Sequence, residues 1–145
     1  MLSPSRTILA AAIVVLSPAL VFTGVAYAFD LNGAWATDPD QCSKVFEKKG
    51  DSITLSDSSD LYGSGFVIDG KKVIGKTARC TINSTKEEGA TINFLASCAT
   101  EIMFQNIQFS LKIINDNTIS RIFPGMSDMS ISFSRCPSSA FRRSS

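Results

Sequence analysis

The sequence predicts an all-β fold, a small antiparallel barrel of about eight strands with one short helix, preceded by a signal peptide. Three observations support this prediction. Apolar and polar residues alternate with period two in short segments after residue 50, most clearly at 107–113. Turn sequences separate these segments, and Asp69-Gly70 is the strongest hairpin signal among them. Four cysteines behind an apolar N-terminal stretch indicate an exported domain with disulfides.

Residues 1–28 contain the parts of a secretory signal peptide. Arg6 is followed by an uncharged, largely apolar stretch that ends in Ala26-Tyr27-Ala28, with small residues at both outer positions. An uncleaved transmembrane anchor is the alternative, because the stretch is long enough to span a bilayer. Pro18 interrupts the stretch and disfavours that alternative. We therefore expect cleavage after residue 28, a periplasmic or secreted product, and no stable membrane anchor.

The mature chain would carry no net charge. The 14 Lys and Arg residues of the full sequence include Arg6, so 13 remain after cleavage, against 13 Asp and Glu residues. We expect one barrel domain at 29–137 and a flexible tail at 138–145, which contains the basic pair Arg142-Arg143. A neutral domain has no field strong enough to recruit nucleic acid, so no nucleic-acid partner is expected.

One short helix is expected after a first strand at 31–37. Asp38 can cap its N-terminus, Pro39 suits its first turn, and Gly50 can end it after residue 49.

Short strands joined by turns account for the rest of the chain. Two hairpins are expected around turns at 69–70 and 86–89. The strands are expected at 52–55, 65–68, 71–75, 77–83, 90–98, 107–113, 118–123 and 129–134. A meander of such strands closes into a barrel or packs as a sandwich, and a barrel leaves no exposed sheet edge.

The four cysteines are expected to form two disulfides. Cys80 and Cys98 lie on the two arms of one hairpin, and each shares its face with apolar residues, as a cross-strand disulfide requires. Cys42 would then pair with Cys136 by elimination. A simple meander places these two cysteines at opposite ends of the barrel. Either the pairing is wrong, or the helix runs back along the barrel and brings Cys42 to the end where Cys136 lies. Because the sequence has no His and no C-x-x-C, we expect no metal site, and no cofactor.

Gly33-Ala34-Trp35, just inside the mature N-terminus, resembles the G-x-W signature of lipocalins and related calycin barrels. In those families the Trp packs at the closed barrel end beneath an Arg of the last strand, and Arg135 is the candidate here. The resemblance implies a calycin-like meander and a cation–π contact of roughly 0.5–2 kcal/mol. A core tryptophan without a ligand role is the alternative for Trp35.

The run from Gly33 to Asp38, followed by Cys42, also resembles small exported proteins of Gram-negative bacteria. That resemblance supports the compartment and implies no activity.

Arg121 joins Trp35 and Arg135 as a candidate ligand-binding residue. In a strand it would lie on the same face as the apolar residues Ile119 and Phe123, so it could face the interior. A buried guanidinium must pair with a carboxylate or bind an anionic ligand. The rarity of buried charges favours the alternative, in which its sequence neighbours face inward or strand twist carries Arg121 to the rim.

Two loops carry large apolar residues that suggest a partner-binding surface. Met103 and Phe104 lie between two strands, and Met126 lies in the segment 124–129. Strand counting places both loops at the same end of the barrel. They would either pack as a lid on the core or contact a partner protein.

No catalytic constellation is evident, and we expect a non-enzymatic protein. The acidic pairs Asp57 with Asp60 and Glu87 with Glu88 lie in polar turns, and no His is present to activate a nucleophile. The favoured hypothesis is an exported barrel that binds an unknown small ligand or associates with the envelope. The alternative is a protein-binding module, such as an inhibitor of an extracellular hydrolase.

Overall fold

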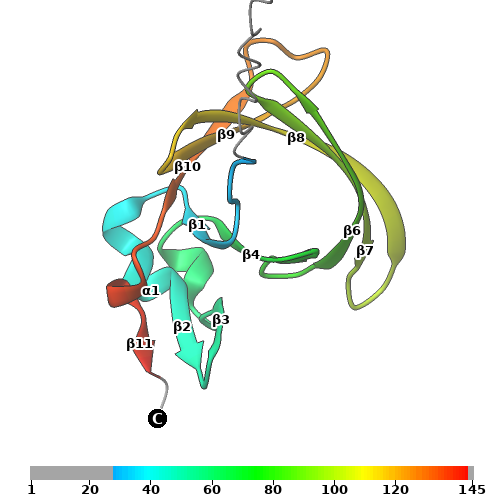
Figure 1. Ribbon diagram of the computed structural model, residues 1–145. Coiled ribbons are helices and arrows are strands. Elements are labelled where there is room, and N and C mark those ends of the chain that lie inside the picture. Colours follow the sequence, from blue (N-terminus) through cyan, green and yellow to red (C-terminus); the bar gives the residue numbers. More distant parts are fainter. Residues whose placement is uncertain (1–27, 144–145) are drawn as a thin grey trace, which may run out of the picture.

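The computed structural model describes residues 28–143, and eight of their strands form a closed antiparallel barrel (Figure 1). The order around the ring is β1, β10, β9, β8, β7, β6, β5, β4 and back to β1. These strands are β1 (Gly33–Ala36), β4 (Gly65–Asp69), β5 (Lys72–Ile74), β6 (Arg79–Glu88), β7 (Thr91–Ala99), β8 (Phe104–Asn115), β9 (Thr118–Ile122) and β10 (Ser130–Arg135). The expected fold class is confirmed, while residues 1–27 of the expected signal peptide lie outside the described residues.

An insertion leaves the ring between β1 and β4 and packs beside it. It contains a 3-10 turn (Pro39–Gln41), α1 (Cys42–Val45), β2 (Phe46–Lys49), β3 (Ser52–Leu55) and a second 3-10 turn (Ser59–Leu61). The strands β2 and β3 form a small sheet with the C-terminal strand β11 (Arg142–Arg143). In Figure 1 this sheet lies outside the ring, next to β1 and β4.

The antiparallel strands give the barrel two distinct ends. Connections 75–78, 100–103 and 123–129 and the start of the insertion lie at one end, which we call the open end. The N-terminal segment 28–32 and the short turns that precede β5, β7 and β9 lie at the other, the closed end. The prediction that the two Met-containing loops share one end is confirmed.

Glycines permit two of the tight turns at the closed end. Gly70 and Gly89 have φ values of +59° and +61°, in the left-handed region that other residues rarely adopt. The hairpin expected around Asp69-Gly70 is present, but its turn lies one residue later, at 70–71, because Asp69 is the last residue of β4 and pairs with Lys72. The second turn was expected at 86–89 but lies at 89–90, because the β6–β7 ladder continues to the pair Glu88 and Thr91.

The sheet is apolar on both faces near β1, and each face has its own core. The inner core contains Trp35, Ile82, Ile92, Phe94, Leu111, Ile119 and Phe133. The outer core lies between the ring and the insertion and contains Ala34, Ala36, Cys42, Val45, Phe46, Val67 and Cys136. Strand alternation produces this division, since neighbouring residues of β1 point to opposite faces.

The expected helix is shorter than the sequence suggested. The Asp38 side chain accepts a hydrogen bond from the backbone N–H of Asp40, as the capping pattern indicates, and the helical turns end at Val45. Residues 46–49 were expected to be helical but form β2, in which Phe46 pairs with Leu55. An isolated helix of this length is marginal, so burial of Phe46 and a full strand ladder decide the conformation.

The segment 138–143 is not the flexible tail that we expected. A 3-10 turn (Ser138–Ala140) leads into β11, which pairs in parallel with β2. The ring of Phe141 lies edge-on to that of Phe46, with centroids 6.2 Å apart. The segment 138–143 is therefore held against the outer core through Ala140 and Phe141.

Both expected disulfides are present, Cys80–Cys98 across the β6–β7 hairpin and Cys42–Cys136 between the insertion and the barrel. The geometric conflict over the second pair is resolved by the insertion. The helical turns fold back over the outer face of β1, where the backbone N–H of Cys136 donates to the carbonyl of Ala34 (2.8 Å). The Cys42 and Cys136 Cα atoms then lie 5.8 Å apart.

Removing the Cys42–Cys136 disulfide should destabilise the protein more than removing Cys80–Cys98. The two span 94 and 18 residues, which corresponds to chain-entropy contributions of roughly 4.7 and 3.2 kcal/mol. Urea unfolding of the two double Cys→Ser variants of the mature chain should differ by about 1.5 kcal/mol. Equal destabilisation by the two changes, or a larger loss of stability on removing Cys80–Cys98, would contradict the view that Cys42–Cys136 stabilises the fold by joining the insertion to the barrel.

Candidate functional site

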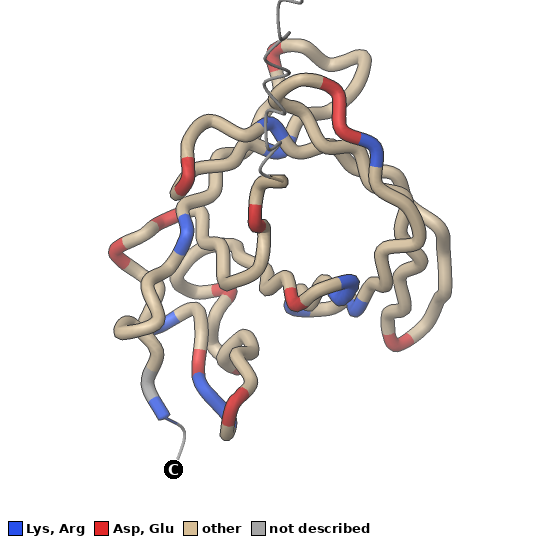
Figure 2. The backbone as a smooth tube through the Cα atoms, viewed as in Figure 1, with Lys and Arg blue, Asp and Glu red and all other residues tan. Residues whose placement is uncertain are grey.

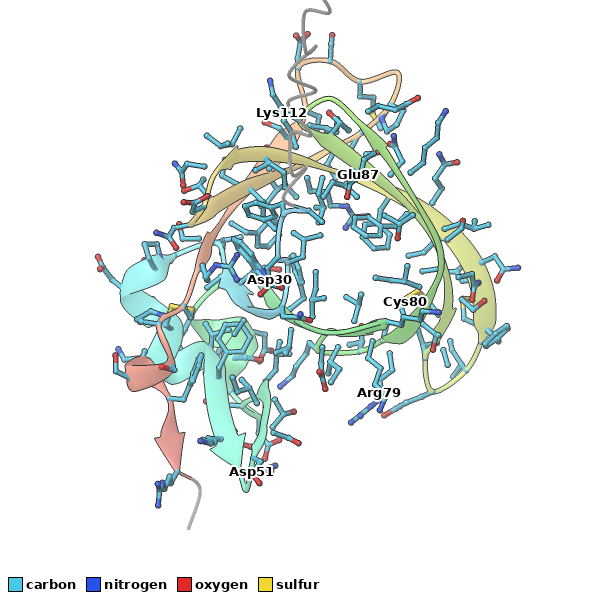
Figure 3. The ribbon with its side chains drawn as sticks, in the orientation of Figure 1. Asp30, Asp51, Arg79, Cys80, Glu87 and Lys112 are labelled. Atoms are coloured by element: carbon cyan, nitrogen blue, oxygen red, sulfur yellow. A yellow bond between two sulfur atoms is a disulfide. The ribbon has the colours of Figure 1, made fainter. Side chains whose placement is uncertain are left out.

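The candidate site is a cavity of about 620 Å³ that enters the barrel from its open end. Its wall inside the barrel is apolar except for one arginine, Arg121. The apolar part consists of Phe66, Val73, Cys80, Ile107, Phe109, Leu111 and Phe133. Figure 3 shows Cys80 pointing into the ring while its neighbour Arg79 points away, as strand alternation requires. A volume of this size falls within the range of roughly 300–1,000 Å³ that is typical of small-molecule sites.

At the closed end an arginine lies over the only tryptophan of the sequence. Arg135 is level with Trp35 in the β1–β10 ladder, and its guanidinium carbon lies 4.3 Å from the centroid of the buried indole. The predicted contact between these two residues is confirmed. Phe29 lies on the same guanidinium at 5.8 Å.

Arg135 also fixes the N-terminal segment by hydrogen bonds to backbone carbonyls. Its Nη1 donates to the Asn32 carbonyl (2.5 Å), its Nη2 to the Asp30 carbonyl (2.6 Å) and its Nε to the Asp116 carbonyl (3.2 Å). The indole N–H of Trp35 donates to the Leu31 carbonyl (2.9 Å). Neither Trp35 nor Arg135 lines the cavity at the open end. The contacts of Arg135 join β1, β10 and the N-terminal segment, and its side chain lines a small pocket with Phe29 at the closed end.

Arg121, in contrast, lines the cavity at the open end. It is half-buried and stands level with Leu111 on β8 and Ile131 on β10. Its guanidinium carbon lies 5.0 Å from the ring centroid of Phe123, at the start of a loop of the open end. The alternative in which the sequence neighbours of Arg121 face inward is therefore wrong. The other alternative, a position near the rim, agrees with the contact to Phe123 and with the half-buried side chain.

The other charged residues of the lining, Lys76 and Asp60, interact with each other. The Lys76 ammonium lies 3.8 Å from the Asp60 carboxylate. It also donates to the backbone carbonyls of Ser56 (3.0 Å) and Asp57. This arrangement anchors the 75–78 connection to the insertion and leaves Lys76 little capacity for a ligand.

The apolar residues of the open-end loops are exposed and do not form a lid. Phe104 is 71% exposed, and Met103 and Met126 are each about half exposed, as is Met129. The lid alternative is therefore wrong. The structure brings these residues to the same end as the cavity mouth, and contact with a partner stays a prediction.

The charged side chains on the remaining surface form no cluster that could hold a metal within the described residues. Charges of both signs are interspersed around the backbone (Figure 2), and no group of His, Cys, Asp and Glu that could hold a metal is found there. A side-chain hydrogen bond to Glu88 raises the pKa of Lys86, and the same bond lowers the pKa of Glu88. This exposed pair lies at the end of β6, away from the cavity.

Sequence reasoning did not identify most of the cavity wall. The clean alternation at 107–113 could have indicated the inward residues Ile107 and Phe109. Phe66 and Val73 lie in strands too short for a clear period. The contacts of Lys76 depend on a connection that folds against a distant insertion, and nothing local in the sequence predicts them.

Comparison of the chain with family models, curated proteins and solved structures gives no match. The two disulfides indicate an oxidising, non-cytoplasmic location. Among residues 28–143, no helix is both long and apolar enough to cross a bilayer. The function therefore has to be argued from the barrel and its cavity.

Replacing Arg135 with Gln should free the N-terminal segment and destabilise the barrel by about 2–3 kcal/mol, because hydrogen bonds to a charged group are lost. Arg135→Lys should restore only part of this stability, since an ammonium cannot match the guanidinium fork. The measurement is urea unfolding followed by tryptophan fluorescence. The matched control is Arg79→Gln, which alters an exposed, outward-facing arginine. Equal effects of the two Gln variants would contradict the role of Arg135 in holding the N-terminal segment.

Proposed function

We propose that this chain is an exported, non-catalytic binding protein that holds a small, largely apolar ligand inside its barrel. The observation that carries the proposal is the cavity of about 620 Å³, whose inner wall is formed by aromatic and aliphatic side chains. A preformed concave apolar site with few polar groups is the usual form of a small-molecule site.

A non-catalytic role is supported by the chemistry of the lining. The sequence has no His, and all four cysteines are in disulfides. The carboxylate of the lining, Asp60, is exposed and lies beside Lys76. Such a site lacks the paired, environment-tuned groups that general acid–base catalysis uses.

Export is supported by the signal-peptide pattern together with the disulfides. Cleavage after Ala28 would start the mature chain at Phe29, whose half-buried side chain packs against the inner core. We propose a periplasmic or secreted location. The Trp35–Arg135 contact and the eight-stranded meander also support a likeness to calycin barrels, which stays a proposal.

The mature chain should bind Nile red, a neutral apolar dye, with an increase and blue shift of its fluorescence. Val73→Trp should abolish the signal, because the larger side chain fills the cavity from β5. The matched control is Leu95→Trp on β7, where the side chain is 45% exposed, and it should leave binding unchanged.

Absence of dye binding to the wild-type chain would overturn the carrier proposal. Circular dichroism of both variants separates a blocked cavity from a failure to fold.

The second candidate function, a protein-binding module such as an inhibitor of an extracellular hydrolase, is favoured by one observation. Ile102, Met103 and Phe104 are 89%, 52% and 71% exposed, which is a large apolar surface for a single loop. Such side chains on a disulfide-braced scaffold are typical of binding loops. Under this function, Phe104→Ser would abolish binding of a partner and leave Nile red binding intact.

A further inference from the structure

The cavity wall carries one cation whose partners are incomplete. Arg121 lines the cavity, half-buried, on β9. Within the described residues it makes a contact with the Phe123 ring but has no ion pair and no side-chain hydrogen bond. A guanidinium has five N–H donors in a fixed fork, so most of its hydrogen-bonding capacity is unused by the protein.

The charges around the cavity do not supply a counter-ion for Arg121. Asp60, the acidic residue of the lining, is 3.8 Å from the Lys76 ammonium, which offsets its charge. The lining therefore carries one net positive charge, which is located on Arg121. Because Lys76 already contacts Asp60 and two backbone carbonyls, Arg121 is the cation of the lining that is available to a ligand.

The surroundings of Arg121 are apolar on the inner side. Leu111, the partner of Arg121 on β8, is buried. Phe133 on β10 is also buried, and it pairs with Ile119, two residues before Arg121 on β9. A low-dielectric wall strengthens the attraction between the guanidinium and an anion and makes an unpaired charge costly. Carboxylates and phosphates match the guanidinium fork by two parallel hydrogen bonds.

We propose that the ligand is a single-chain amphiphile with an anionic head group, bound with its head at Arg121 and its chain along the apolar wall. The proposal rests on the function proposed above and names the ligand class of the same cavity. Phe123 holds the guanidinium near the mouth, so that the head group is reached from solvent while the chain is covered. Carboxylate and phosphate heads share this chemistry, and the experiment separates them.

The test compares four probes with the same twelve-carbon chain by isothermal titration calorimetry, below their critical micelle concentrations. Dodecanoate and dodecyl phosphate carry anionic heads, dodecanol is neutral, and dodecyltrimethylammonium is cationic. At least one anionic probe should bind the mature chain about tenfold to hundredfold more tightly than dodecanol, as expected for a charge-assisted hydrogen bond. The cationic probe should bind most weakly, and added salt should narrow these differences.

Arg121→Gln should reduce anion affinity to the level of dodecanol and leave dodecanol affinity unchanged. Arg121→Lys should retain part of the preference, and Arg79→Gln, which alters an outward arginine near the same end, should retain all of it. Equal affinity for all four probes, or an anion preference that survives Arg121→Gln in a folded variant, would overturn the proposal and leave the carrier function standing. Failure of the probes and of Nile red alike would overturn both.

Discussion

The structure depends on β1, a strand of four residues that closes the ring between β4 and β10. Its alternation places Trp35 inside the barrel and its small alanine neighbours outside, where the insertion packs closely. Gly65 on β4 permits this approach, since a Cβ there would lie 2.7 Å from the Phe46 ring and 2.9 Å from the Trp35 carbonyl. Both cores of the protein therefore meet at one short strand.

This closure makes the two ends of the barrel unequal. At the closed end, Arg135 stands opposite Trp35 and binds the carbonyls of the N-terminal segment. At the open end, the chain leaves β1 for the insertion, and the connections there leave room for the cavity. The Cys42–Cys136 disulfide joins the insertion to the last barrel strand on the outer face, so it braces the wall without occupying the interior.

Features with a local signal in the sequence were predicted well. The hairpin around Gly70 and the cross-strand pair Cys80–Cys98 follow from short patterns. The position of Arg135 over Trp35 was expected from the resemblance to the G-x-W signature. Features decided by contacts between distant segments were missed. Residues 46–49 became a strand because β3 and β11 pair with them, and helix-capping signals give no information about such partners.

The site was predicted only in part for the same reason. The parity of Arg121 pointed to the interior, while the rarity of buried charges favoured a position at the rim. Both hold, because Arg121 lines the cavity and stays partly accessible. The cavity itself was not predicted, since whether a barrel is filled depends on its shear and on packing between many strands. The exposed loop residues such as Phe104 were correctly grouped at one end, because strand direction alone determines that.

The central claim is that the barrel interior holds an accessible apolar cavity, and a xenon-pressurised crystal of the mature chain tests it most directly. Xenon occupies apolar cavities that packed side chains leave open. We expect a xenon site inside the ring, in contact with Phe109, Leu111 and Phe133. A barrel interior filled by side chains, with xenon bound only at the surface or not at all, would contradict the claim.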